Sequence, residues 1–353
     1  MSILTKYIMK TVMLSVLGVV LLLSALYVIF TFIAQTGDIG KGSYDSLSAI
    51  LYVVMTLPTN IVLFLPVAGL LGTLIGLGLL ATNSELMVMR AAGVSIRKIG
   101  VGVFWASVVM MVITFVLSAY VAPELQKMGD MRRSMAMNQQ DFLWQSKSFW
   151  LKDGPNFVHV GGRDRHGHLQ DVVKYDVDNS RLVSVTSAPE AVYKNNEWVL
   201  NDASVTHINK KQITVDEHQS VSWPSLVAPI LLNVASTNPR NLNALGLLTL
   251  IQYQKANGLD ATEYEFKAWR LLFQPLSVMV LMLLAIPFVF GPLRSSVMGW
   301  QIMTGLIFGL GFFFVDRFFG PFSEVYHIPP IVGAALPSIL VLFVLLVLSL
   351  RMG

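Results

Sequence analysis

The chain has 353 residues, of which 54% are hydrophobic and 13% are charged, and its net charge is +4. A soluble globular protein has roughly 25% charged residues, so this composition is typical of a membrane protein with some water-exposed mass. The absence of cysteine excludes disulfides, thiolate zinc sites, iron–sulfur clusters and a cysteine nucleophile.

Apolar runs between charged residues predict six transmembrane helices, because a spanning helix needs about 20 mostly apolar residues. Such runs form helices in a bilayer, where every backbone group needs a partner. The run from Asp45 to Glu85 is too long for one span, so a break near Pro58 is expected, with residues 46–58 along the interface. The spans are expected at about 12–34, 61–81, 99–121, 270–294, 294–316 and 331–350.

Lysine and arginine in short loops predict the orientation, because cytoplasmic loops are enriched in them. With the N-terminus inside, the outer short loops carry only Lys41 and Arg317. The inner loops carry Lys6, Lys10, Arg90, Arg97, Lys98, Arg294 and Arg351. Both termini are therefore expected in the cytoplasm. No small-residue cleavage site follows the first apolar run, which indicates an uncleaved span rather than a signal peptide.

Residues 125–265 have a different character. Stretches such as RLVSVTSA and EWVLNDASV alternate apolar and polar residues between turn pairs such as Asp153-Gly154. This pattern predicts an extracytoplasmic all-β domain of sandwich, jelly-roll or open-barrel type, with a jelly-roll-like fold expected. A helix at 243–257 should end at Gly258. The predicted layout is three spans in 1–123, the β-domain in 124–262 and three spans in 263–353.

No motif of a catalytic centre is present. The sequence has no P-loop, no H-E-x-x-H and no G-x-S-x-G, and its histidines are scattered. His166 and His168 flank Gly167, but no third metal ligand is near them in the sequence. Asp316 and Arg317 are expected to be solvated at the membrane surface. We therefore expect a non-enzymatic chain that binds no metal or cofactor of its own.

A short polar segment, SELMVMRAAG at 84–93, separates the second and third spans. Asn83 or Ser84 is expected to cap a helix there, and Glu85 lies in the first turn, where the helix dipole favours a negative charge. Gly93 is expected to end the helix. The positive-inside pattern places this helix in the cytoplasm.

Leu86 and Met89 of this helix fall near one face and are expected to be exposed. An exposed Leu/Met face with one acidic residue suits docking into a groove of another protein. A helix that lies on the lipid surface shows the same pattern, so the two interpretations stay open at this point.

Glycines four residues apart let helices approach closely. Gly305 and Gly309 on the fifth span could form a sliding gate against a second permease, or pack statically. For Gly72 and Gly76 on the second span, static packing is favoured. Aromatic residues of the fifth span could face acyl chains or bulk lipid: Phe308, Phe312, Phe313 and Phe314.

Several longer motifs are more specific. They are GSYD at 42–45, SELMVMRAAGVS at 84–95, FQPLSVMVLMLLAIPFVFGPLRS at 273–295, FGP at 319–321 and IPPIVGAALP at 328–337. In this order, and over the whole chain, they resemble the LptF/LptG permease family of the lipopolysaccharide export ABC transporter. GSYD and FGPLRS favour the LptG branch over its LptF paralogue.

The resemblance implies an inner-membrane permease with six spans and a periplasmic β-jelly-roll. LptF and LptG assemble around two copies of the ATPase LptB, which would bind ATP and magnesium in place of this chain. Lipopolysaccharide would leave the outer leaflet of the inner membrane and pass to LptC and the proteins beyond it. No nucleic-acid partner is implied. The helix at 84–93 corresponds to the family's coupling helix, whose expected contacts with LptB are Ser84, Glu85, Leu86, Met89, Arg90 and Gly93.

Lipopolysaccharide offers phosphates and acyl chains, so its binder needs an apolar cavity with basic residues at the outer rim. Arg133 matches a basic position of the family, and the adjacent Arg132 could instead snorkel to lipid phosphate. The family's lysines at the outer end of span one are replaced here, where Asp38 stands, and Lys41 could substitute for them. The expected lipopolysaccharide contacts are Lys41, Arg132, Arg133, Phe308 and Phe312, in a cavity walled mainly by spans one and five.

Two other functions remain open from the sequence. A permease for another lipid or a lipoprotein would share the ATPase partner but not the substrate. The familiar lipoprotein and macrolide exporters place their large domain after span one of a four-span chain, which disagrees with the order here. A stand-alone membrane-anchored binding protein would have no ATPase partner and would tolerate changes at 84–93.

Overall fold

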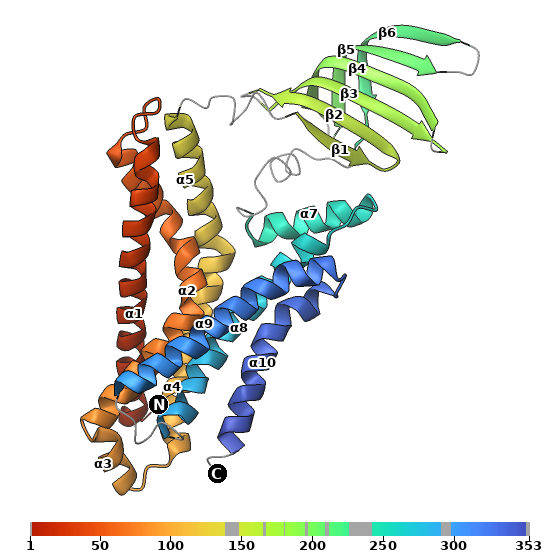
Figure 1. Ribbon diagram of the computed structural model, residues 1–353. Coiled ribbons are helices and arrows are strands. Elements are labelled where there is room, and N and C mark those ends of the chain that lie inside the picture. The colour runs from red at the N-terminus through yellow and green to blue at the C-terminus, as the bar shows by residue number, and fades with distance from the viewer. Residues whose placement is uncertain are drawn as a thin grey trace. The chain divides into compact units, whose positions relative to one another are not determined.

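A computed structural model describes residues 2–137, 148–164, 167–179, 181–194, 197–208, 212–225, 242–290 and 298–350. The chain forms two compact units, whose elements are labelled in Figure 1. One comprises Met1–Gly37, Ile50–Lys127 and Thr262–Gly353, and the other Asp38–Ala49 and Met128–Ala261. Arg294 and Arg351, two of the cations that predict the orientation, lie outside the described residues, as does His166.

Six helices are long and apolar enough to cross a membrane, which confirms the predicted number of spans. They are α1 (Ile3–Gln35), α2 (Ser46–Thr82), α4 (Ile96–Val116), α8 (Thr262–Phe290), α9 (Met298–Val325) and α10 (Pro330–Leu350). A 3₁₀ turn, η1 (Thr36–Asp38), follows α1, and the short α3 (Glu85–Ala91) connects α2 to α4. A π-helical turn, η2 (Leu117–Val121), joins α4 to α5 (Ala122–Ala136), so the third span continues to Ala136.

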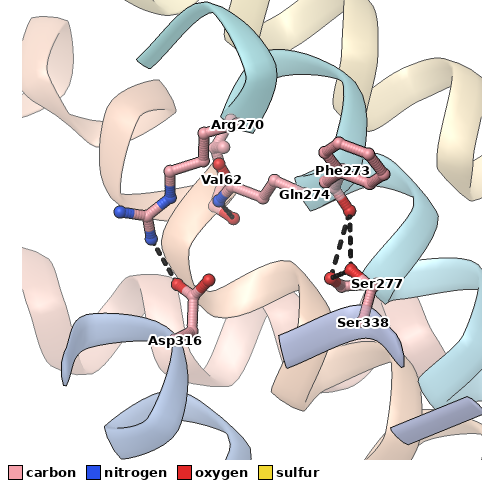
Figure 2. Close-up of polar contacts among 7 residues, drawn as sticks. All are labelled: Val62, Arg270, Phe273, Gln274, Ser277, Asp316 and Ser338. Carbon is pink, nitrogen blue, oxygen red and sulfur yellow. Dashed lines mark hydrogen bonds and ion pairs between the residues drawn. The ribbon is translucent and has the colours of Figure 1, made fainter. Parts of the chain in front are cut away.

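The predicted break at Pro58 is wrong, because α2 runs without interruption with Pro58 and Pro66 inside it. A proline removes one backbone donor, and membrane helices tolerate this when a neighbour supplies a replacement. Pro66 removes the N–H that would bond the Val62 carbonyl four residues earlier. Gln274 of α8 donates its side-chain amide to that carbonyl at 3.0 Å, as Figure 2 shows.

The helices of the membrane unit pack closely around α8 and α2. Val278, Leu281 and Met282 of α8 are fully or almost fully buried, in one core cluster with residues of α1, α2 and α4. At Gly72 of α2, an added Cβ would lie 2.4 Å from the Val16 Cα of α1. The two helix backbones are therefore in contact, which supports static packing at this glycine.

The second unit contains an antiparallel sheet, which confirms the predicted all-β character. Its strands are β1 (Phe149–Asp153), β2 (Asn156–Arg163), β3 (Leu169–Asp178), β4 (Arg181–Lys194), β5 (Glu197–Ile208) and β6 (Ile213–Trp223). In the described residues each strand pairs with its neighbours in sequence, in the order β1 to β6, as the ribbon in Figure 1 shows. One face is apolar and buried, with Val158, Val160 and Leu169 fully covered and Trp198 beside Trp223.

Helix α7 (Ala244–Ala256) is fixed to the β1 edge of this sheet. The Tyr253 hydroxyl donates to the Lys152 carbonyl at 2.8 Å and accepts from the Lys152 N–H at 3.0 Å. Asn257 accepts from the Gly154 N–H at 2.8 Å. The helix ends at Gly258, whose φ of +62° suits glycine, and this confirms the predicted end.

Candidate functional site

Helix α3 forms the turn between α2 and α4, and its two ends differ from each other. Ser84 occupies the N-cap position, one of the two that were predicted, but its backbone is in the left-handed region, with φ 60°, and its side chain makes no capping bond. The predicted end is confirmed. Gly93 has φ +84°, its N–H donates to the Arg90 carbonyl at 3.0 Å, and the Val94 N–H donates to the Met89 carbonyl at 3.0 Å. These two bonds form a Schellman motif.

Glu85, in the first turn of α3, is oriented by the first transmembrane helix. The Tyr7 hydroxyl of α1 donates to Glu85 Oε2 at 2.7 Å. The carboxylate is partly exposed, so it keeps a surface that a partner can reach. The bond joins the turn helix directly to a span, and a displacement of one is resisted by the other.

The predicted exposed face of Leu86 and Met89 is wrong. Leu86 is only 5% exposed and lies in the core cluster of the membrane unit, and Met89 packs against the same cluster. The helix is short and its ends are tied to α2 and α4, so this Leu/Met pair anchors it. The outward apolar side chains are Met87 and Val88, each 67% exposed. Arg90 is also exposed.

Lys41 and Arg133, two of the predicted phosphate-binding cations, meet on one carboxylate. Asp38 Oδ1 lies 2.6 Å from Lys41 Nζ, and Asp38 Oδ2 lies 2.6 Å from Arg133 Nη2. The Ser43 N–H donates to the Ala136 carbonyl at 2.6 Å, which holds this loop to the end of α5. Arg132 is exposed. The site is therefore a pair of cations bridged by an internal anion.

Tyr44 lies beside this cluster and is almost completely buried. Burial raises the pKa of Tyr44, although the Arg133 guanidinium acts in the opposite direction. The hydroxyl therefore stays neutral at physiological pH. It contributes no second negative charge to the cations at Asp38.

The predicted residues of α9 have different surroundings. Gly305 and Gly309 face α2 of the same chain, where an added Cβ would lie 2.2 Å from Leu74 Cδ1 and 2.9 Å from Val67 Cγ1, respectively. Phe312 is only 7% exposed and belongs to the core, so it does not face lipid. Phe308 is 40% exposed and its ring lies 4.9 Å from that of Phe288.

Asp316 of α9 forms an ion pair with Arg270 of α8, and both side chains are largely covered. The expectation that Asp316 is solvated at the membrane surface is therefore wrong. Figure 2 shows Arg270, Gln274 and Ser277 in succession along α8, bonded to Asp316, to the Val62 carbonyl and to Ser338 of α10. These polar contacts tie α8 to three neighbouring helices.

An apolar cavity of about 500 Å³ lies between α1, α2 and α4. Met13, Leu17, Leu65, Met110 and Leu117 are among its lining residues, and its surface is almost entirely non-polar. Helix α1 lines it, but α9, the other wall expected for the substrate cavity, contributes no lining residue to this cavity. Its size and lining suit a hydrocarbon chain.

Sequence reasoning missed the functional groups that act across distant helices. Tyr7 and Gln274 have no local signal, because their partners, Glu85 and the Val62 carbonyl, lie on other helices. The Asp38–Lys41 pair could have been predicted from its spacing of three residues, at which opposite charges commonly meet on a helical turn.

Comparison with known proteins agrees with this architecture. The family described as lipopolysaccharide export system permease LptF/LptG matches residues 6–351. The chain is 37% identical over 341 residues to lipopolysaccharide export system permease protein LptG of Escherichia coli (strain K12), covering 96% of this chain and 95% of that protein. It is 35% identical over 340 residues to LptG of Haemophilus influenzae, with the same coverage. This chain belongs to the LptF/LptG family of lipopolysaccharide export system permeases.

Proposed function

We propose that this protein is a transmembrane subunit of an ATP-driven ABC transporter. It would extract lipopolysaccharide from the outer leaflet of the inner membrane and pass it to a periplasmic bridge toward the outer membrane. The proposal extends the family assignment with the α3 geometry, the cation pair at Asp38 and the apolar cavity. The chain itself is non-catalytic in this scheme, and a separate ATPase binds ATP and magnesium.

The observation that carries the proposal is the outward surface of α3. Met87 and Val88 present exposed apolar side chains, with Arg90 exposed and Glu85 held by Tyr7. Hydrophobic residues flanked by both signs of charge fit a groove on an ATPase subunit of the LptB type. Because Leu86 and Met89 fix the helix to the core, force applied to its outer surface reaches α1, α2 and α4.

The substrate would engage two separate parts of the chain. Its phosphates would bind the cations Lys41 and Arg133, because charge-assisted hydrogen bonds from lysine and arginine to phosphate are strong. The exposed Arg132 would lie beside them. An acyl chain would occupy the cavity lined by α1, α2 and α4, and Phe308 offers a further partly exposed aromatic surface. Gly305 and Gly309 would let α9 slide on α2 as the gate opens.

The proposed assembly pairs this chain with LptF and two LptB subunits. Both termini and α3 would lie on the cytoplasmic side, because cytoplasmic segments are enriched in lysine and arginine. The cations of these segments are Lys6, Lys10, Arg90, Arg97 and Lys98. The sheet unit then lies in the periplasm, where it would hand lipopolysaccharide to LptC.

The experiment that tests the proposal is affinity purification of the tagged chain from solubilised membranes, with mass spectrometry of its partners. We expect stoichiometric recovery of a small P-loop ATPase and a second six-span permease. Val88→Asp and Glu85→Lys should remove the ATPase while the variant still inserts. Val215→Asp is the control for Val88→Asp, because it places the same charge on a valine of similar exposure, 59%, in β6. This variant should retain the ATPase.

Two results would overturn the proposal. One is recovery of the chain alone under conditions that preserve a control ABC complex, which would support a stand-alone binding protein. The other is an ATPase partner whose activity lipopolysaccharide neither stimulates nor inhibits, with no crosslink from position 133 to lipopolysaccharide. That result would indicate a permease for another lipid or a lipoprotein.

A further inference from the structure

The hairpin between β2 and β3 carries a cluster of side chains that the export function does not use. Asp164 and His168 lie in the turn that connects the two strands, and Glu190 lies on β4. Glu190 pairs with Gln170 of β3 in the sheet register, so it is carried next to the start of that strand. Glu190 is thereby brought beside Asp164 and His168, so the expectation that no third metal ligand lies near the histidine is wrong.

The three side chains present metal-ligating atoms to one another. His168 Nδ1 lies 2.9 Å from Glu190 Oε1 and 3.4 Å from Asp164 Oδ2. All three ligand atoms lie within 4.8 Å of one another. Zinc binds nitrogen and carboxylate oxygen at about 2.0–2.2 Å, so tetrahedral ligands around it are about 3.3–3.6 Å apart. Only small side-chain movements are needed to reach that geometry.

Each carboxylate is oriented by a hydrogen bond from a group that is not a proposed ligand atom. The backbone N–H of His168 donates to Asp164 Oδ1 at 2.9 Å, while Asp164 Oδ2 faces the imidazole. Asn201 donates its side-chain amide to Glu190 Oε2 at 3.3 Å, while Glu190 Oε1 faces the same imidazole nitrogen. One oxygen of each carboxylate is therefore held by the protein and the other points toward His168. Supporting bonds of this kind are typical of metal ligands.

The charges favour one class of ion. A neutral imidazole can donate a proton from Nδ1 to only one of two carboxylates, whereas a divalent ion can bind all three groups together. Calcium and magnesium prefer ligand sets made of oxygen alone, so the imidazole of His168 disfavours them. Zinc binds imidazole and carboxylate together, so this ligand set favours an ion of the zinc type.

We propose that Asp164, His168 and Glu190 bind a divalent transition-metal ion of the zinc type, with water completing its coordination. The ion would fasten the β2–β3 turn to β4. The residues are partly exposed, so the site can exchange its ion with the surroundings. This inference is independent of the export function, because it concerns the sheet unit alone.

The test is a calorimetric titration of the purified full-length chain, in detergent at pH 7.5, with zinc sulfate. We expect one saturable site per chain. His168→Ala and Glu190→Gln should each weaken zinc binding at least about tenfold, since even residues that only support metal ligands change affinity by about 10–100-fold. His207→Ala is the matched control, because His207 in β5 lies 3.8 Å from a single carboxylate, that of Asp216. It should bind zinc as the parent does.

A second measurement separates binding from folding. Zinc should slow hydrogen exchange at the amides of His168 and Leu169 in the parent and the His207→Ala variant, but not in Glu190→Gln. Unchanged circular dichroism of Glu190→Gln in EDTA would show that this variant is folded. The proposal is overturned if the parent binds no zinc stoichiometrically, or if His168→Ala and Glu190→Gln bind it with the parent's affinity.

Discussion

The Tyr7 hydroxyl donates a 2.7 Å hydrogen bond to the Glu85 carboxylate, which joins the first transmembrane helix to the short helix between the second and third spans. Glu85 is partly exposed, but one oxygen of its carboxylate is bonded to α1. The orientation of Glu85 therefore depends on α1, and a movement of α3 would act on α1 through the same bond. In the proposed transporter, this bond would be one route by which ATPase closure moves a span.

Tyr7→Phe tests this connection, because it removes the hydroxyl and keeps the ring. We expect the ATPase to co-purify normally while lipopolysaccharide release per ATP hydrolysed falls severalfold, measured in proteoliposomes. Tyr27→Phe is the control, since Tyr27 on the same helix forms a 3.1 Å bond with Thr56 of α2, away from α3. A Tyr7→Phe variant with the parent's transport ratio would contradict a coupling role for this bond.

Asp38→Asn should strengthen phosphate binding at Lys41 and Arg133. The carboxylate bridges both cations at 2.6 Å and competes with an incoming phosphate, whereas an amide carries no charge. We expect tighter binding of lipopolysaccharide and a steeper loss of affinity with salt, measured by fluorescence anisotropy at two ionic strengths. Asp45→Asn changes a nearby aspartate that caps α2 through the Ser48 N–H at 2.8 Å, and should leave both quantities unchanged. Weaker binding by Asp38→Asn would show that Asp38 positions the cations instead of competing for them.

Gly72→Ala should destabilise the membrane unit, because its Cβ would lie 2.4 Å from a backbone atom of Val16. Overpacking of this kind costs about 1–3 kcal/mol. Gly18→Ala on α1 is the control, since an added Cβ there meets nothing within 4 Å. Reversible unfolding in mixed micelles measures both. Equal stability of the two variants would contradict the close approach of α1 and α2.

Much of the membrane topology could be predicted from the sequence, because a span is encoded locally as a run of apolar residues. The six spans and the ends of two helices at Gly93 and Gly258 followed from such local rules. The continuity of α2 through Pro58 and Pro66 did not, because a local rule cannot show how a helix accommodates a proline. At Pro66 the carbonyl left without a donor is bonded by Gln274 of another helix. The prediction of which face of α3 is exposed was also wrong. Leu86 and Met87 are both apolar, and only their packing in the folded chain decides which one is buried.

Tyr253→Phe should weaken the attachment of α7 to β1 and reduce the loss of stability at alkaline pH. The hydroxyl makes two bonds to Lys152, and burial raises the pKa of Tyr253 above its usual value near 10. The folded state therefore binds the proton more tightly than the unfolded state. The contribution of the Tyr253 hydroxyl to stability is therefore present below about pH 10 and is lost as the pH rises through the pKa of Tyr253 in the folded state. Thermal unfolding of the parent should show this loss above about pH 10, and that of Tyr253→Phe should show less of it.

Gln274→Leu should lower the free energy of unfolding, because Gln274 supplies the hydrogen bond that Pro66 of α2 cannot donate. The variant leaves the Val62 carbonyl without its donor, and an unsatisfied buried group costs about 1–3 kcal/mol. Pro66→Ala restores a backbone N–H four residues after Val62, so Gln274→Leu should cost less in that background. Ser277→Ala is the control, because its bond with Ser338 does not involve Pro66 and its cost should be the same in both backgrounds. A double-mutant cycle measured by unfolding in mixed micelles gives the coupling. An equal cost of Gln274→Leu with and without Pro66 would mean that Gln274 does not replace the missing backbone donor.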